Sequence, residues 1–393
     1  MLAKTKKNIP RYAKLCRLLI LTSHLPRTQK FQKYLARTEV SSSVYTKLLH
    51  IMSAHASSQN DAANKLLWSN PEFAARYKTG EQLTGEYAND LCLQMGLQSY
   101  KSPVHFLDLA CGTGIVSKKA LAILQSSQSA RPFPEDKFTF ADLSSEMLKV
   151  VHSRVIAERW PISEEAKNME VVEVNMTDTK LPPDTYTHLG CNFGPGMAPT
   201  PDHTLRESYR MLRSGGVAGW TAWQHTAWLP DMTRALEDIR DSAARRCAEG
   251  KGTDEDQKLA KIPGMMKFED MIARFAGADL EKLRAEGVAE ADLPRWDKEG
   301  WFKSRAEKAG FVDVKVSIVK KDYTLSKEDA YNMVKPMTGI ISTFWTEQQR
   351  KDIEGADLQA RLKEWFDQCL DVKDGKVQWN DWQAMVITAK KPQ

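Results

Sequence analysis

A short apolar run that ends in a glycine-rich turn constrains the fold of this chain more than any other stretch. Residues 104–109 are apolar apart from His105 and one acid near the end, Asp108, and they predict a buried strand. The turn that follows contains Gly112 and Gly114, and residues 115–124 predict a helix. Glycine lets a ligand approach the backbone, and the free N–H groups of a helix N-terminus face that ligand. The sequence therefore predicts an α/β protein with a nucleotide-binding corner.

Two kinds of nucleotide site compete for this corner. A dinucleotide fingerprint requires a third glycine three residues after Gly114, but that position is Ser117. Residues 108–114, Asp-Leu-Ala-Cys-Gly-Thr-Gly, instead resemble the first motif of class I S-adenosylmethionine-dependent methyltransferases. The resemblance implies that this turn approaches the methionine and ribose parts of S-adenosylmethionine. The residues so placed are Asp108, Ala110, Gly112 and Gly114. A glycine turn in another kind of α/β sheet is the alternative.

A second acid follows the next predicted strand. Residues 138–142 predict that strand, and Asp142 ends it, where a carboxylate can accept both ribose hydroxyls of a nucleoside. Residues 141–148, Ala-Asp-Leu-Ser-Ser-Glu-Met-Leu, resemble the second motif of the same family. The resemblance implies that Asp142 binds the ribose and that Leu143 and Met147 lie against the adenine. The alternative for Asp142 is the N-cap of the helix that follows.

The residues after the third predicted strand, 170–174, match the family less closely. The adenine amino group needs an acceptor there, and either Asn175 or Asp178 could supply it. We favour Asp178, with Met176 nearby.

The fourth predicted strand, 186–191, leads to the reactive end of the cofactor. Ligands of open α/β sheets bind beyond the carboxyl ends of the strands, at the switch point of the topology. Asn192 and Phe193 follow this strand directly, so we expect them beside the sulfonium.

The acceptor side is predicted around the fifth strand, 217–223. Residues 207–216, which precede it, resemble the helix-stop turn typical of the family. His225 follows the strand, and a neutral imidazole there could take a proton from a hydroxyl, thiol or ammonium group. A packing or substrate-orienting histidine is the alternative. Three aromatic residues are predicted to line the substrate pocket: Tyr77, Trp223 and Trp228.

The rest of the fold follows from the later strands and from the resemblance. Residues 311–319 and 382–389 predict strands six and seven. The resemblance implies a Rossmann-like, seven-stranded sheet whose last strand is antiparallel and inserted next to strand five. The methyltransferase domain is predicted to span residues 61–393. Helical inserts at 231–300 and 326–372 are expected to form a substrate lid.

The net charge of +5 comes from the first part of the chain. Of the 56 Lys and Arg, ten lie within residues 1–38 and no acid does, which leaves 46 basic against 51 acidic residues. A slightly acidic body gives no reason to expect a nucleic-acid partner. The basic, acid-free stretch is typical of a mitochondrial transit peptide, or of a disordered tail. Together with a polar linker it makes residues 1–60 a leader. The expected location is cytoplasmic, with a mitochondrial one as the alternative.

Several other classes of protein are disfavoured. No apolar run approaches the roughly 20 residues of a membrane span. The six cysteines form no CxxC pair and no acid/histidine cluster has ligand spacing, so no metal site or disulfide framework is expected.

The resemblance is strongest to the small-molecule branch, the type 11 and ubiquinone-biosynthesis-like methyltransferases. Residues 186–223 are similar to methyltransferases of fungal secondary metabolism. This implies methyl transfer from S-adenosylmethionine to an O, N, S or C nucleophile of an apolar small molecule. A mitochondrial quinone C-methyltransferase, a protein or RNA methyltransferase and a non-catalytic regulator remain alternatives. The substrate, the methylated atom and the oligomeric state are left open.

Overall fold

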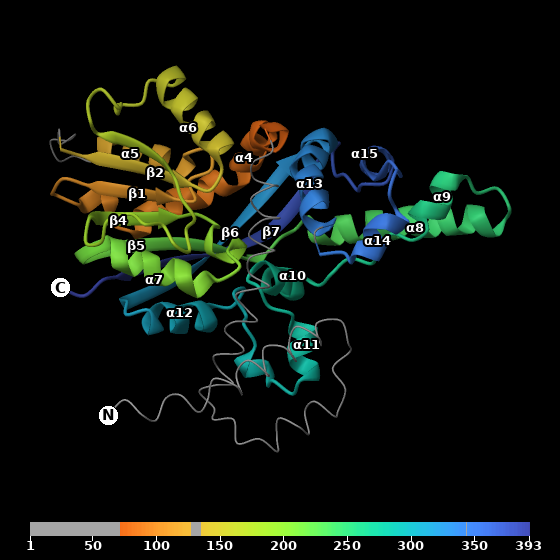
Figure 1. Ribbon diagram of the computed structural model, residues 1–393. Helices are drawn as coiled ribbons and strands as arrows, with labels where there is room; N and C mark the ends of the chain where they lie inside the picture. Colours follow the sequence, from red (N-terminus) through yellow and green to blue (C-terminus); the bar gives the residue numbers. More distant parts are fainter. Residues whose placement is uncertain (1–70, 127–134, 343) are drawn as a thin grey trace, which may run out of the picture. The chain divides into compact units, whose positions relative to one another are not determined.

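A seven-stranded mixed sheet organises the described part of the chain (Figure 1). The computed structural model describes residues 71–126, 135–342 and 344–393, apart from the side chains of residues 71–79, 336 and 340. The predicted boundary at residue 60 therefore lies outside the described residues. The strands are β1 (His105–Leu109), β2 (Lys137–Asp142), β3 (Met169–Glu173), β4 (Tyr186–Cys191), β5 (Leu212–His225), β6 (Val312–Leu325) and β7 (Val377–Lys390).

The strand order β3-β2-β1-β4-β5-β7-β6 confirms the predicted Rossmann-like sheet. Strands β1 to β5 pair in parallel, and β7 lies antiparallel between β5 and β6, as the resemblance implied. The order reverses between β1 and β4, where Asp108 aligns with Gly190. Ligands of such sheets bind at the carboxyl ends of the strands on either side of this switch point.

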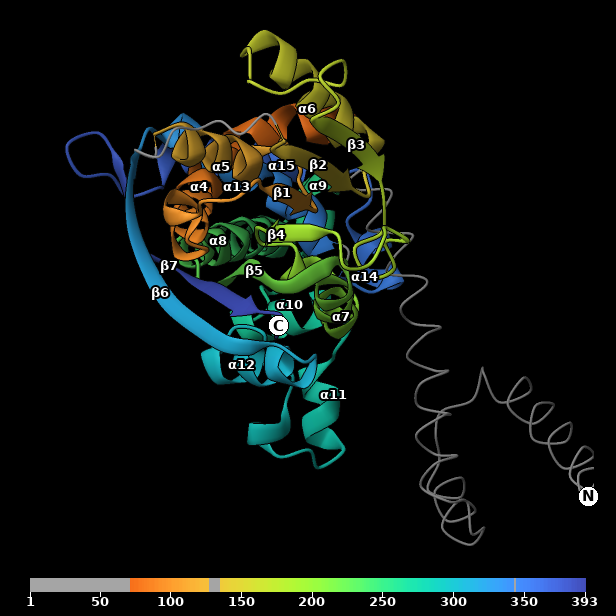
Figure 2. The same cartoon turned by 90° about the vertical axis from the view of Figure 1, so that its left-hand side faces the viewer.

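Two apolar cores cover the two faces of the sheet. Side chains alternate between faces along a strand, so Phe106 packs into one core and Leu107 into the other. Figure 2 shows α4, α5 and α6 over one face and α7 and α12 over the other. These helices are α4 (Pro71–Gln94), α5 (Ile115–Ser126), α6 (Ser145–Ala157), α7 (Pro201–Met211) and α12 (Glu299–Lys308).

The two predicted inserts are helical and share a third core. Its buried residues include Met232, Leu236, Trp365 and Phe366, and it continues into β7 through Trp382. The insert helices are α8 (Leu229–Ala248), α9 (Asp254–Leu259), α10 (Phe268–Phe275), α11 (Leu280–Ala285), α13 (Lys327–Ser342), α14 (Glu347–Asp352) and α15 (Leu358–Gln368). Short 3-10 turns are η1 (Leu97–Ser99), η2 (Pro195–Met197) and η3 (Glu290–Asp292).

The limits of several elements differ from the prediction, and β5 begins at Leu212 rather than at residue 217. The predicted insert 231–300 contains a short helix in a hydrophilic stretch, α9, which begins at Asp254. Thr253 and Asp256 form a capping box, which satisfies the free N–H groups of a first helical turn without any apolar stripe. Strands β6 and β7 also run several residues beyond the predicted limits, where they pair with each other as a long ribbon.

Candidate functional site

The turn after β1 has a left-handed backbone at three positions. The φ angles are 54° at Ala110, 52° at Gly112 and 80° at Gly114. Glycine adopts this region without the clash of a Cβ, whereas alanine is strained there by about 1–2 kcal/mol. At Gly114 space is also limited, because an added Cβ would lie 3.3 Å from both Val151 Cγ2 and Trp160 Cη2. The two glycines are thus required by conformation, and the second also by close packing.

Hydrogen bonds fasten the turn to β2. Cys111 donates its N–H to Ala141 O at 3.1 Å, and Gly112 donates its N–H to Asp142 Oδ2 at 2.8 Å. Gly114 N–H closes the turn on Cys111 O at 2.8 Å. The first two predicted motifs therefore meet in space, and the second acid holds the backbone of the first turn.

Asp142 lies half-buried at the end of β2 with both carboxylate oxygens engaged. Besides Gly112, it accepts the N–H of Ser144 at 2.9 Å on Oδ1. Burial raises its pKa above the ordinary value. A carboxylate offers about four acceptor sites, so each oxygen can accept one further hydrogen bond. The helix N-cap is Ser144, whose Oγ accepts Met147 N–H at 3.2 Å, so the N-cap alternative for Asp142 is wrong.

Asp108 is fully buried and its two oxygens differ. Ser117 donates its N–H at 2.9 Å and its hydroxyl at 2.8 Å to Oδ2. Oδ1 is buried without a hydrogen-bond partner among the described residues. Desolvation raises the pKa of Asp108 to about 7. Sequence reasoning used Ser117 only to reject a dinucleotide site, although this serine fixes the orientation of the first acid.

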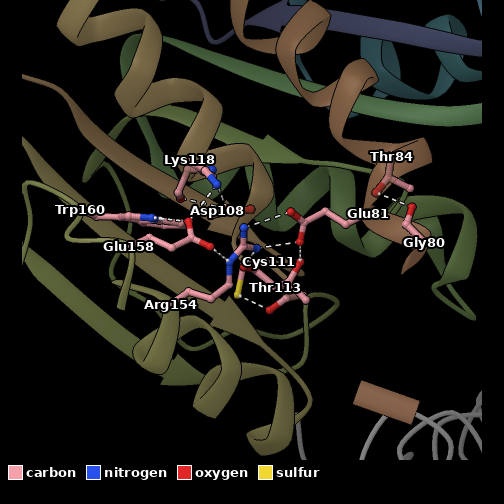
Figure 3. A network of polar contacts seen from close by, with 12 residues as sticks. Gly80, Glu81, Thr84, Asp108, Cys111, Thr113, Lys118, Arg154, Glu158 and Trp160 are labelled. Atoms are coloured by element: carbon pink, nitrogen blue, oxygen red, sulfur yellow. Dashed lines mark hydrogen bonds and ion pairs between the residues drawn. The ribbon is translucent and has the colours of Figure 1, made fainter. Parts of the chain in front are cut away.

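A buried ion pair joins the turn to two helices, as Figure 3 shows. Arg154 of α6 donates to Glu81 of α4 through Nη1 at 2.7 Å and Nη2 at 3.1 Å. Arg154 Nη1 also donates to the carbonyl of Thr113 at 2.8 Å, and the Thr113 hydroxyl donates to Glu81 at 2.5 Å. Arg154 Nε pairs with Glu158 at 3.0 Å. Sequence reasoning missed Glu81 and Arg154, since no local motif links residues so far apart in the chain.

The end of β4 is tied to both α4 and β5. Asn192 donates from Nδ2 to Thr84 O at 3.2 Å and accepts the hydroxyl of Thr221 on Oδ1 at 2.7 Å. The same hydroxyl oxygen accepts Phe193 N–H at 2.8 Å. Phe193 has a φ angle of 57° and is the second left-handed non-glycine residue of the site. Asn192 and Phe193 are therefore held in fixed orientations at the switch point.

An aromatic cluster includes Phe193 and residues of three neighbouring elements. Phe193 and Trp223 are stacked with ring centroids 4.0 Å apart and an interplanar angle of 17°. Tyr87 of α4 meets both rings edge-on, at 5.7 Å from Phe193 and 5.4 Å from Trp223. Trp382 of β7 extends the cluster, at 5.4 Å from Trp223. Two predicted site residues, Phe193 and Trp223, are thus in contact.

The predicted adenine side is less compact. Met176 approaches the turn, since a Cβ at Gly194 would lie 3.5 Å from its Sδ and 3.2 Å from Ala110 Cβ. Asp178 is exposed and pairs with Lys180 at 2.7 Å. Asn175 Oδ1 accepts the N–H of Thr177 at 3.0 Å and its hydroxyl at 2.8 Å. Leu143 is half-buried and Met147 is buried.

The last three predicted site residues are His225, Trp228 and Tyr77, and only Trp228 shares a core with members of this cluster, Trp223 and Trp382. His225 is exposed at the end of β5, where it pairs with Gln383 of β7. Trp228 is buried in the core of the inserts, just before α8. Tyr77 lies in the first part of α4, and its side chain is outside the described residues.

Two further findings concern metals and membranes. In the described part of the chain, no group of three or more His, Cys, Asp or Glu side chains is arranged to hold a metal ion. Within the same residues, no helix combines the length and apolar character that crossing a membrane requires.

The known proteins that resemble this chain are methyltransferases. Residues 92–225 match the model of the ubiE/COQ5 methyltransferase family. The methyltransferase tpcH of Aspergillus fumigatus is 28% identical over 322 residues, which cover 81% of this chain and 96% of the relative. The acetylaranotin bis-thiomethyltransferase of Aspergillus terreus is 27% identical over 328 residues, which cover 83% of this chain and 97% of the relative. Among solved structures, Haemonchus contortus phosphoethanolamine N-methyltransferase 2 has a TM-score of 0.41 and 12% identity. The match covers 82% of this chain and 58% of the solved chain.

Proposed function

Since this chain is a class I S-adenosylmethionine-dependent methyltransferase, we propose that it methylates an apolar small molecule of secondary metabolism. The acceptor atom is an O, N, S or C nucleophile. The observation that carries the proposal is the aromatic cluster of Tyr87, Phe193 and Trp223, in which Phe193 follows β4 and Trp223 lies in the last part of β5. Tyr87 and Phe193 are buried and Trp223 is half-buried, so an acceptor would contact the cluster at Trp223. An apolar aromatic contact there suits a small apolar acceptor better than a charged polymer.

The residues that would hold the cofactor fit its chemistry. The carboxylate of Asp142 can accept from the ribose hydroxyls, and the left-handed turn lets a ligand approach the backbone. Oδ1 of Asp108, which has no partner among the described residues, is a further acceptor directly before this turn in the chain. The turn itself contains Ala110, Gly112 and Gly114, and Met176 lies near it. We assign Leu143 and Met147 to the adenine, with Asp178 as the acceptor for its amino group.

The chemistry that the proposal requires is simple. S-adenosylmethionine supplies an electrophilic methyl group on a sulfonium. The protein aligns the acceptor atom with that methyl group, with Asn192 and Phe193 beside it, and excludes water. We propose the helical inserts as the lid, because their shared core continues into β7 beside the cluster. We keep His225 as the proposed general base for an acceptor that must lose a proton.

A substrate screen tests the proposal. The purified protein is incubated with S-adenosylmethionine labelled in the methyl group and with apolar thiols, phenols, amines and activated carbon acids. Label transfer to at least one apolar compound, with none to protein or RNA, supports the proposal. Transfer only to protein or RNA would overturn it. Unchanged turnover in His225→Ala would remove the general-base role and leave the transferase intact.

A mitochondrial quinone C-methyltransferase is the second candidate. The match of residues 92–225 to the ubiE/COQ5 family favours it, as does the basic composition of residues 1–38. Growth of a quinone-deficient strain that expresses the chain would support this candidate. Absence of rescue by a chain directed to mitochondria would exclude it.

A further inference from the structure

The ion pair between Glu81 and Arg154 is buried in a place where an apolar contact would serve packing equally well. The side chains are only 13% and 9% exposed. Removing two charges from water costs several kcal/mol per ion, and packed apolar residues often replace such pairs without loss of stability. A buried pair of this kind is therefore poorly explained by stability alone. Its value must be sought in the geometry that it fixes.

What the pair fixes is Thr113, the residue between the two glycines of the turn. Its carbonyl accepts from Arg154 and its hydroxyl donates to Glu81, so both polar ends of one residue are held. The neighbouring residues Cys111 and Gly112 are held by β2. Glu81 differs from these partners because it comes from α4, which precedes the nucleotide-binding sheet in the chain.

The same helix continues from the turn to the aromatic cluster at steps of three residues. Glu81 contacts the turn, the carbonyl of Thr84 accepts from Asn192, and Tyr87 meets Phe193 and Trp223. Residues at this spacing lie near one another on a helix surface. One rigid element thus touches the cofactor turn, the residue predicted beside the sulfonium, and the aromatic cluster.

We propose that Glu81 and Arg154 are positioning residues that couple the conformation of the glycine turn to the seating of α4. Cofactor affinity then depends on the ion pair, and α4 becomes more ordered when the cofactor binds. Coupling between two sites is reciprocal, so an acceptor held by the aromatic cluster strengthens cofactor binding by the same factor. This last consequence rests on the proposed function, whereas the effect on the cofactor does not.

The decisive experiment measures the affinity of the full chain for S-adenosylhomocysteine by calorimetry. Glu81→Gln keeps the shape of the side chain and removes its charge. We expect binding to weaken about tenfold, within the range usual for coupled sites. Arg154→Lys keeps the charge but not the two-pronged geometry, and it should weaken binding by a similar factor. Amide hydrogen exchange over residues 80–94 gives a second readout: the ligand should slow it in the wild type and much less in Glu81→Gln.

A matched control separates positioning from general stability. Arg246 and Asp256 form an ion pair between α8 and α9, which lie away from α5 and α6 in Figure 1. Arg246→Met should lower the melting temperature and leave the affinity for S-adenosylhomocysteine unchanged. Wild-type affinity in a folded Glu81→Gln variant would overturn the proposal, and so would equal loss of affinity in Arg246→Met.

If Glu81→Gln does not fold, Thr113→Val answers the same question. It leaves both charges paired and removes only the hydroxyl that joins the turn to Glu81. Weaker binding in this variant supports the coupling, and unchanged binding rejects it. Because these measurements use the cofactor product alone, they give the same answer whether or not the acceptor is an apolar small molecule.

Discussion

The side chain of Asp108 is fully buried, so neither of its carboxylate oxygens is exposed to water. One oxygen is satisfied by Ser117 and the other has no partner among the described residues. A group in this environment holds its proton to higher pH than in the unfolded chain. The consequence can be measured without any knowledge of the substrate.

We expect Asp108 to make the ligand-free protein less stable as pH rises from about 4 to about 7. Its pKa of about 7 in the folded state exceeds the ordinary value of 3.8, so the folded state binds the extra proton within this window. The contribution is complete below the window and lost above it, and it amounts to at most about 4 kcal/mol. Urea unfolding at a series of pH values measures the slope.

Asp108→Asn is the control, because an amide cannot titrate. The slope should become smaller, and Asp142, whose pKa burial also raises, should keep its own contribution. Two acids with a lowered pKa of about 2, Glu158 and Glu207, do not interfere. Their stabilisation is lost only as pH falls below their ordinary range. Parallel pH profiles for the wild type and Asp108→Asn would contradict the prediction.

Asp142→Ala should weaken cofactor binding by about 2–4 kcal/mol, because two charge-assisted hydrogen bonds to the ribose are lost. The structure adds a second effect, since the variant also leaves the N–H groups of Gly112 and Ser144 without their acceptor. Calorimetry with S-adenosylhomocysteine measures the first effect. Ser144→Ala is the control: losing the N-cap should cost about 1 kcal/mol of stability with little change in affinity. Unchanged affinity in Asp142→Ala would refute the assigned cofactor position.

At the scale of single residues, the sequence predicted what is encoded locally. Residues 108–114 and 141–148 each form a continuous motif, and the structure brings them into contact through Gly112 and Asp142. The link between Glu81 and Arg154 was not predictable, because the partners are 73 positions apart and neither belongs to a motif. The roles of the two motifs and of this ion pair in cofactor binding remain predictions.

At the scale of elements, apolar runs located the buried strands well and the ribbon of β6 and β7 poorly. Parallel strands covered on both faces are continuously apolar and stand out in a sequence. Strand β6 lies at the edge of the sheet and its residues are largely half-exposed or exposed, so little apolar patterning marks its length. In β7 the alternation is interrupted at Asp381, which has a φ angle of 64°.

The aromatic cluster gives a prediction at this scale, because α4, β5, β7 and the segment after β4 meet in it. Trp223→Ala should lower kcat/KM for the acceptor roughly ten- to hundredfold, as expected when a large apolar contact is lost. Affinity for S-adenosylhomocysteine should change much less. Initial rates at saturating cofactor measure the effect once an acceptor is known.

Trp301 offers a matched control for this variant. It is also half-buried, but it lies on α12 and packs against Arg305 on the opposite face of the sheet. Trp301→Ala should leave kcat/KM for the acceptor nearly unchanged. An equal decrease in both variants would indicate a general loss of stability rather than a role of the cluster.

At the scale of the whole molecule, the basic residues are unevenly distributed along the chain. Removing residues 1–38 takes away ten basic residues and no acid, which changes the net charge from +5 to about −5. We expect the shortened protein to bind S-adenosylhomocysteine within about twofold of the full chain, because the predicted cofactor residues all lie beyond this stretch. Calorimetry on both proteins measures this.

Fluorescent fusions of the same two proteins test the alternative location. Mitochondrial fluorescence that depends on residues 1–38 would support a transit peptide. Identical distributions would leave these residues as a basic tail. A large loss of cofactor affinity on shortening would contradict the expected independence of the two parts.

The position of β7 sets the order in which this fold can be built. Its residues are made after all the other strands, yet they fill the place between β5 and β6 and receive Tyr87 and Gln94 of α4. In a nascent chain that has completed β6, this strand still has no partner and β5 has an unpaired edge, and unpaired edges are prone to aggregation. The sheet is complete only when β7 pairs with β5 and β6, and contacts between residues far apart in the chain form slowly. We expect productive folding to follow synthesis of β7 and to benefit from chaperones that shield exposed strand edges.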